Sequence, residues 1–173
     1  MQYSRFLAAV AASGLLVGGC SSGPENDAHA VGETASVELA EGLTVNVTVD
    51  GISSGDRADL AERGADPGTS SDDNLYWFVD YTIEVAEGDM ELLREHINEF
   101  GAWSDDWTAT NNRGGEMAPV TIIGGTFDCG RGDGPEGLSV DIPYVSCKVF
   151  AAPSSVDLEY VEVPETGTWR TEE

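Results

Sequence analysis

The chain has 173 residues with 32 acidic and 8 basic side chains, which gives a net charge of −24 at neutral pH. This excess of negative charge argues against binding to nucleic acid or to anionic lipid head groups through charge. The length suits a single domain with one hydrophobic core.

Residues 1–19 have the features of an export signal. Arg5 supplies a positive charge near the start, and an apolar stretch rich in Ala and Leu follows over residues 6–17. That stretch is too short to span a bilayer, which takes roughly 20 apolar residues. A charged start, a short apolar core and small residues at the end predict a signal peptide that is removed on export.

The end of this segment, Leu16-Val17-Gly18-Gly19-Cys20, resembles the lipobox of bacterial lipoproteins. The resemblance implies cleavage before Cys20 and attachment of diacylglycerol to its thiol, with palmitate among the acyl groups, which would anchor the protein to the extracytoplasmic face of the cell membrane. An ordinary signal peptide, with Cys20 incidental, is the alternative.

The mature chain is predicted to have three parts. Residues 20–34 are polar and form a flexible tether, residues 35–165 form the folded domain, and residues 166–173 form a C-terminal tail. Loss of Arg5 with the signal leaves a charge near −25 (7 minus 32). Because the acidic residues are spread along the chain, we interpret them as a solvated surface, suited to a salt-rich habitat, rather than as a site for a cationic partner.

Two cysteines remain after Cys20, namely Cys129 and Cys147. An even number in an oxidising compartment predicts one disulfide bond. Such a cross-link would stabilise the fold by roughly 3 kcal/mol in the chain-entropy model. Two free thiols are the alternative.

Most of the folded domain has the pattern of β-strands. Valines alternate with polar residues over 43–49, which predicts a strand with one buried face. The next segment, 53–74, is rich in Ser, Gly and Asp and is predicted to be a long loop.

The strongest strand pattern covers residues 75–86. Its core face is predicted to carry Leu75, Trp77, Val79, Tyr81, Ile83 and Val85. The opposite face begins with Tyr76 and Phe78 and ends in polar residues, so its first half is expected to be covered by a loop or by a partner.

Residues 90–100 have helical spacing, because Met90, Leu93, Ile97 and Phe100 lie three or four residues apart. Asp89 is the expected N-cap of this short amphipathic helix, and Gly101 is its expected end.

Further short strands are predicted over 106–110, 117–123, 139–151 and 156–163. In the third of these, Val145, Cys147, Val149 and Ala151 share a face, which is expected to be buried. The alternation in the last slips between Tyr160 and Val161, which indicates a bulge. Several short strands separated by turn residues predict an all-β fold, an antiparallel β-sandwich with one short helix near 90–100.

Several of these motifs occur together in one known group. A lipobox and polar tether precede the strand at 43–49, and the aromatic strand Tyr76-Trp77-Phe78-Val79-Asp80-Tyr81 follows; later come Trp107-Thr108-Ala109, Cys129, and the segment from Val145 to Pro153. The chain thus resembles the DUF4352-type lipoproteins of actinobacteria over roughly residues 36–163. The resemblance implies an immunoglobulin-like β-sandwich at the cell surface and implies no established activity. The predicted helix departs from that pattern.

The sequence offers little for catalysis. His29 lies in the predicted tether and His96 on the predicted helix, and a Gly-x-Ser-x-Gly nucleophile turn is absent from the sequence. Histidines and cysteines are too few for a zinc site, and carboxylates are too abundant to single out a catalytic pair. We therefore predict no catalytic residue, no cofactor and no metal site.

Calcium is the metal ion that the acidic loops would suit best, since hard cations prefer oxygen ligands. The candidates are Asp56, Asp59, Asp66, Asp72 and Asp73 in one loop and Asp105 and Asp106 in another. The chain has no EF-hand spacing, so these aspartates are interpreted as solubilising residues. The Arg131-Gly132-Asp133 tripeptide matches an integrin-binding motif but is short enough to occur by chance.

The sequence thus predicts a non-enzymatic, lipid-anchored binding domain for a protein or envelope ligand. Tyr76, Phe78 and Trp103 are the candidate binding residues, because exposed aromatic clusters tend to mark interfaces. A carboxylate-based hydrolase of an envelope polymer and a calcium-dependent adhesion module are the alternatives.

Overall fold

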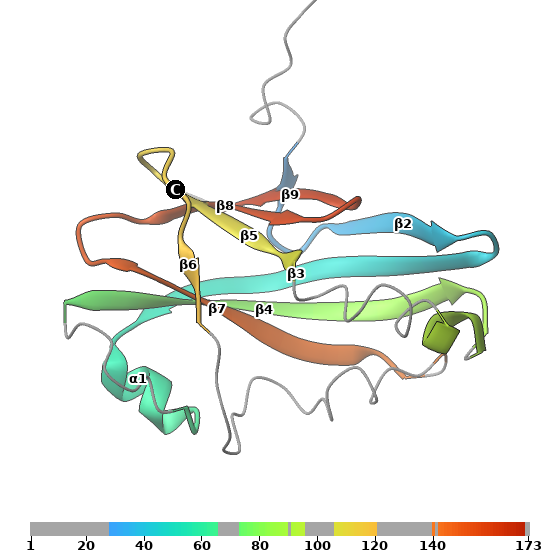
Figure 1. Ribbon diagram of the computed structural model, residues 1–173, viewed down its shortest axis with the longest axis horizontal. Coiled ribbons are helices and arrows are strands. Elements are labelled where there is room, and N and C mark those ends of the chain that lie inside the picture. Colours follow the sequence, from blue (N-terminus) through green and yellow to red (C-terminus); the bar gives the residue numbers. More distant parts are fainter. Residues whose placement is uncertain are drawn as a thin grey trace, which may run out of the picture.

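The computed structural model describes residues 28–65, 73–89, 91–95, 106–120, 140 and 142–171. Two sheets pack face to face (Figure 1). One has the strand order β1-β9-β8-β5, and the other has the order β2-β3-β4-β7-β6. The strands are β1 (His29–Ala30), β2 (Thr34–Ala40), β3 (Leu43–Gly55), β4 (Asn74–Glu87), β5 (Thr108–Asn111), β6 (Ala118–Pro119), β7 (Tyr144–Pro153), β8 (Leu158–Val163) and β9 (Gly167–Arg170).

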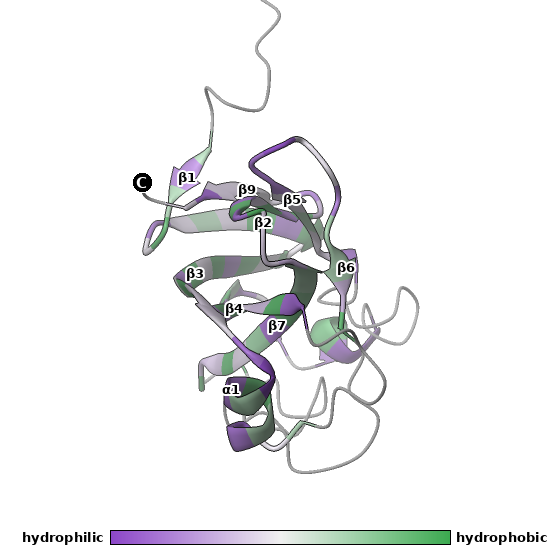
Figure 2. Cartoon of the chain, turned by 90° about the vertical axis from the view of Figure 1, so that its left-hand side faces the viewer, coloured by the Kyte–Doolittle hydropathy of each residue, from purple (hydrophilic) through white to green (hydrophobic). Residues whose placement is uncertain are grey.

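All pairings are antiparallel except the pairing of β1 with β9. The predicted all-β antiparallel sandwich is therefore confirmed. The main core lies between the two sheets and is built from strand residues of alternating polarity (Figure 2). Its fully buried members include Val45, Val47, Val79, Val161 and Trp169.

The strand predicted over 43–49 is confirmed by its alternating burial, but it continues to Gly55. A bulge at Asp50 allows this, because the register with β4 shifts between Val49 and Gly51. The extra residue turns the strand without ending it.

The loop predicted over 53–74 is wrong for the residues that the structure describes. After β3 the chain forms helix α1 (Arg57–Glu62). The Asp56 carboxylate accepts from the backbone N–H groups of Ala58 and Asp59, and the Asp59 carboxylate accepts from the N–H of Asp56 at 2.7 Å. This reciprocal capping box starts the helix. A composition rich in Ser, Gly and Asp suggests a loop, and the two aspartates that form the capping box do not stand out among the other polar residues.

Helix α1 covers the outer face of the five-stranded sheet (Figure 1). Leu60 and Ala65 pack there against Tyr76, Phe78 and Val149 in a second, smaller core. Arg63 lies 4.1 Å from the centre of the Phe78 ring and 3.5 Å from an Asp80 carboxylate oxygen. The outer face of β4 is therefore buried at Tyr76 and Phe78 in its first half, as expected if a segment of the chain covers this second face.

The face predicted to be buried in β7 is the outer one. Val149 is buried under α1, but Val145 is 47% exposed and Cys147 and Ala151 are half-buried. The inter-sheet core instead contains Tyr144, Phe150 and Ala152, which lie on the opposite face of β7. The alternation itself was correct; the prediction assigned the wrong face because small and apolar residues occur on both.

The predicted helix near 90–100 is present at its start. Residues 91–95 are helical, and the Asp89 carboxylate accepts from the N–H groups of Glu91 and Leu92. Leu93 is buried. The expected N-cap is therefore confirmed, whereas Met90, Ile97 and Phe100 lie outside the described residues.

The strands predicted over 106–110 and 117–123 are found as β5 and β6. The bulge predicted in the strand at 156–163 is also present, slightly earlier than expected. The register of β5 with β8 shifts where Thr110 pairs with Tyr160 and Asn111 pairs with Leu158. Glu159 is the extra residue, and Leu158 and Val161 can therefore both face the core.

The predicted ends of the domain need correction. Strand β1 lies inside the predicted tether of 20–34, and β9 lies inside the predicted tail of 166–173. Trp169 of β9 is fully buried, and its indole N–H donates to the Glu33 carbonyl at 3.0 Å. Each segment is too short to show a strand pattern on its own, and the pairing of two chain ends is not visible locally.

Candidate functional site

A groove of about 650 Å³ opens between the two sheets, beside the crossing from β1 to β2. Apolar side chains of Val31, Ile52, Trp77 and Leu158 line it. Its polar side is formed by Asn112, Asp157, Glu159, Arg170 and Thr171. An apolar wall with a few polar groups at the margin is the usual composition of a ligand site.

Trp77 joins the groove to the core. It lies on β4 opposite Ser54 of β3 and Phe150 of β7, and it packs against the inter-sheet core. Its indole Nε1 is buried and has no hydrogen-bond partner among the described residues. A buried donor without an acceptor costs roughly 1–3 kcal/mol. Trp77 therefore contributes its ring to the wall of the groove, while its Nε1 lies in the interior without a partner among the described residues.

The carboxylates at the margin are held by neighbours. Asn112 donates to the Asp157 carboxylate at 3.2 Å, and the two backbones bond at 2.9 Å. Arg170 lies 3.4 Å from a Glu159 carboxylate oxygen, with its guanidinium 5.5 Å from the Tyr160 ring centre. These bonds fix the acidic side chains in place and leave further lone pairs for a ligand.

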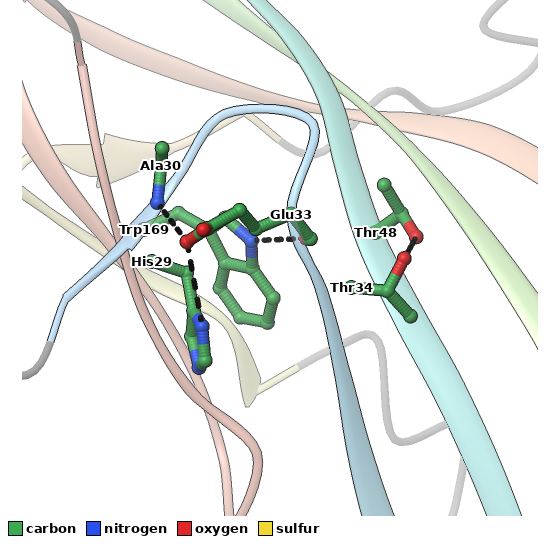
Figure 3. Close-up of polar contacts among 6 residues, drawn as sticks. All are labelled: His29, Ala30, Glu33, Thr34, Thr48 and Trp169. Carbon is green, nitrogen blue, oxygen red and sulfur yellow. Dashed lines mark hydrogen bonds and ion pairs between the residues drawn. The ribbon is translucent and has the colours of Figure 1, made fainter.

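A cluster of contacts fixes the start of the domain close to the groove (Figure 3). Glu33 accepts from the Ala30 N–H at 2.8 Å and lies 3.9 Å from His29 Nδ1. The His29 and Trp169 rings are 5.0 Å apart between centroids. His29, which the sequence placed in the tether, is thus part of the domain and helps to hold β1 on β9.

The predicted binding surface at Tyr76, Phe78 and Trp103 is not formed as expected. Tyr76 and Phe78 are 1% and 2% exposed, because α1 covers them. Trp103 lies outside the described residues. The aromatic cluster is therefore a local core, and its sequence signal was that of buried residues on a second face.

Cys147 is disulfide-bonded. Its predicted partner Cys129 and the predicted lipidation site Cys20 lie outside the described residues, as do His96 and the Arg131-Gly132-Asp133 tripeptide. The identity of Cys129 as the disulfide partner of Cys147 therefore stays a prediction.

Two of the aspartates considered for calcium have a structural role. Asp56 and Asp59 cap α1 with their carboxylates. Asp66, Asp72 and Asp105 lie outside the described residues, and Asp73 and Asp106 are far apart in sequence. Within the described ranges, no group of three or more His, Cys, Asp or Glu side chains is placed to hold a metal ion.

Sequence reasoning missed the groove. Trp77, Ile52 and Leu158 lie on core faces of strands, so their alternation indicates only burial. Asp157, Arg170 and Thr171 come from a turn and a C-terminal strand whose proximity depends on the sheet order. Asn112 and Asp157 are polar residues of two connecting segments, which is a weak signal for a functional site. The sequence does not show that these two segments bond to each other.

None of the helices in the described part of the chain is long and apolar enough to cross a membrane. No protein-family model matches the chain, and neither a curated protein nor a solved structure matches it.

Proposed function

We propose that this chain is a lipid-anchored extracytoplasmic lipoprotein whose β-sandwich binds an envelope or protein ligand in the groove between its sheets. The resemblance to DUF4352-type lipoproteins belongs to the same proposal. The motif ending at Cys20 supports the anchor, and the groove supports the binding role. The observation that carries the binding role is the groove itself, in which the half-buried Trp77 ring forms an apolar wall opposite the carboxylates of Asp157 and Glu159.

The start of the fold at His29 adds a constraint on the anchor. Eight residues lie between Cys20 and His29, which makes nine steps from one Cα to the other, and a fully extended chain covers at most about 3.5 Å per step. A lipid on Cys20 would therefore hold the domain within roughly 30 Å of the membrane surface. Since Val31 lines the groove, the groove would face ligands that are close to the membrane.

The binding role is tested with soluble peptidoglycan fragments released by lysozyme, which offer both sugar and peptide groups. Binding to the full-length protein in detergent would be followed by calorimetry. Trp77→Ala and Asp157→Asn are expected to weaken binding about tenfold each, because each removes a wall contact or a hydrogen bond worth about 1.4 kcal/mol. Asp50→Asn is the matched control, since Asp50 bonds Thr82 on the outer face.

Equal affinity for all four proteins, or absence of binding, would contradict a ligand site in the groove.

The second candidate is a hydrolase, and it is favoured by the presence of Asp157 and Glu159 on one groove. Glycoside hydrolysis by two carboxylates would need both. Fragments incubated with the protein would then shorten over time, and Asp157→Asn or Glu159→Gln would abolish the change. Fragments that bind but keep their length would contradict the hydrolase and support the non-enzymatic binding role.

A further inference from the structure

We infer that the groove takes an extended polypeptide segment, which adds as a strand to the open edge of β3. This inference rests on the proposed binding role and names the class of ligand. It follows from the place where β2 stops.

Strand β2 covers only half of β3. Its pairing runs from Ala40 opposite Leu43 to Thr34 opposite Thr48. Before Thr34 the chain crosses to the other sheet, where His29 and Ala30 pair with β9. Within the described ranges, no strand pairs with the same side of β3 beyond Thr48, although β4 continues to pair with β3 as far as Gly55.

The alternation of an antiparallel ladder shows which backbone groups face this edge. The Val49 carbonyl faces the β2 side, because it accepts from the Gly32 N–H at 2.8 Å. The bulge at Asp50 adds one residue, so Asp50 and Gly51 both face β4. The N–H and C=O groups of Ile52 and Ser54 therefore point away from β4, toward the open edge.

The side chains of the same two residues lie on the inner face of the sheet, and Ile52 lines the groove. Ile52 pairs with Val79 and Ser54 with Trp77, both on the inner face of the sheet. An added strand opposite Ile52 and Ser54 would thus send alternate side chains into the space beside Trp77 and Leu158. The added strand would thus form backbone hydrogen bonds with β3 and place side chains in the groove at the same time.

The open edge spans five residues, Gly51–Gly55, or about 16 Å at 3.3 Å per residue. Soluble proteins usually protect such edges with charged residues or proline. This segment, Gly-Ile-Ser-Ser-Gly, has neither. An edge left open next to an apolar groove is the arrangement that strand addition uses.

Charge defines the partner further. The chain carries a net charge of −24, and the groove margin has two carboxylates, Asp157 and Glu159, against one guanidinium, Arg170. The segment that fits is therefore one in which apolar side chains alternate with basic ones. The apolar side chains enter the groove, and the basic ones remain at its margin and in solvent.

The probe is the peptide acetyl-Lys-Val-Lys-Val-Lys-amide, titrated into the full-length protein in detergent. Binding is expected to slow hydrogen exchange in the proteolytic fragment that covers Gly51–Gly55. All pairings in this sheet are antiparallel, so the valines should form the hydrogen-bonded pairs with Ile52 and Ser54. N-methylation of both valines should then weaken binding at least tenfold, whereas N-methylation of the central lysine should change it less than threefold.

Ser54→Pro is the matching change in the protein, since it removes an edge N–H without removing a bond to β4. It should weaken peptide binding about tenfold, and Ser54→Ala should not. Retained thermal unfolding of Ser54→Pro would show that the fold is intact.

Failure of the peptide to bind, or equal binding of the two methylated peptides, would overturn strand addition. If peptidoglycan fragments still bind in a Trp77-dependent manner, the binding role stands and only the ligand class is wrong. If neither probe binds, both proposals fail.

Discussion

Two tryptophans have different roles: one stabilises the fold, and the other lines the groove. Trp169 is fully buried and donates its indole N–H to the Glu33 carbonyl. Trp77 lines the groove, and its N–H has no acceptor among the described residues. Both rings pack against the same inter-sheet core, but they differ in burial and in the hydrogen bond of the indole N–H.

Substitution by phenylalanine should separate these roles. Trp169→Phe removes buried ring volume and leaves the Glu33 carbonyl without its donor, so it should lower the free energy of unfolding by about 2–4 kcal/mol. Trp77→Phe removes a donor that is already unsatisfied, so its cost should be within about 1 kcal/mol. Urea denaturation of both variants measures this. Equal losses would contradict the assignment of Trp77 as a residue with unused bonding capacity.

At the scale of elements, the junction of β3 and α1 depends on the lack of a side chain at Gly55. A Cβ there would lie 2.7 Å from the Asp59 Oδ2 and 3.0 Å from the Phe78 Cε2. Asp59 is part of the capping box that starts α1, and Phe78 is covered by that helix. The crowding would therefore act on both the cap and the small core.

Gly55→Ala should lower the free energy of unfolding by about 1–3 kcal/mol, the usual cost of overpacking. Gly51→Ala on the same strand is the control, because its Cβ would meet only the Asp80 Oδ2 at 3.9 Å. It should leave stability unchanged within about 0.5 kcal/mol. Thermal unfolding compares the two, and a neutral Gly55→Ala would show that α1 is not held as described.

The sequence predicted the elements whose alternation is strong and local. The strand at 43–49, the strand at 75–86 and the start of the helix after Asp89 all follow from such patterns. Helix α1 was missed because six residues with one buried leucine show no period. Strands β1 and β9 were missed because each is stabilised by the other and not by its own pattern.

The groove could not be predicted for a related reason. Among the described strands, β3 has no neighbour on one side beyond Thr48 because β2 ends there, while the polar margin of the groove comes from residues in and next to strands of the other sheet. Register and sheet order decide both, and neither is encoded by any single stretch of sequence. Tyr76 and Phe78 were proposed instead because an aromatic pair on a second face does not reveal what covers it.

At the scale of the whole molecule, the excess of negative charge is the feature that most affects how stability depends on salt. A net charge of −24 on a chain of 173 residues implies self-repulsion that salt should screen. The melting temperature should therefore rise between 10 mM and 500 mM NaCl, with an equal rise in KCl. A fall in melting temperature with salt would contradict a solvated acidic surface. CaCl₂ at matched ionic strength distinguishes the adhesion alternative, since a specific calcium site would raise the melting temperature beyond the NaCl value.

A lipid on Cys20 is proposed to anchor the sandwich to a membrane. The most direct test is the intact mass of the protein from the membrane fraction. We predict the mass of the chain from Cys20 onward plus a diacylglycerol-linked lipid, with Cys129 and Cys147 alkylated only after reduction. An unlipidated chain with a different first residue would contradict the anchor, and the role of the groove near a membrane would fall with it.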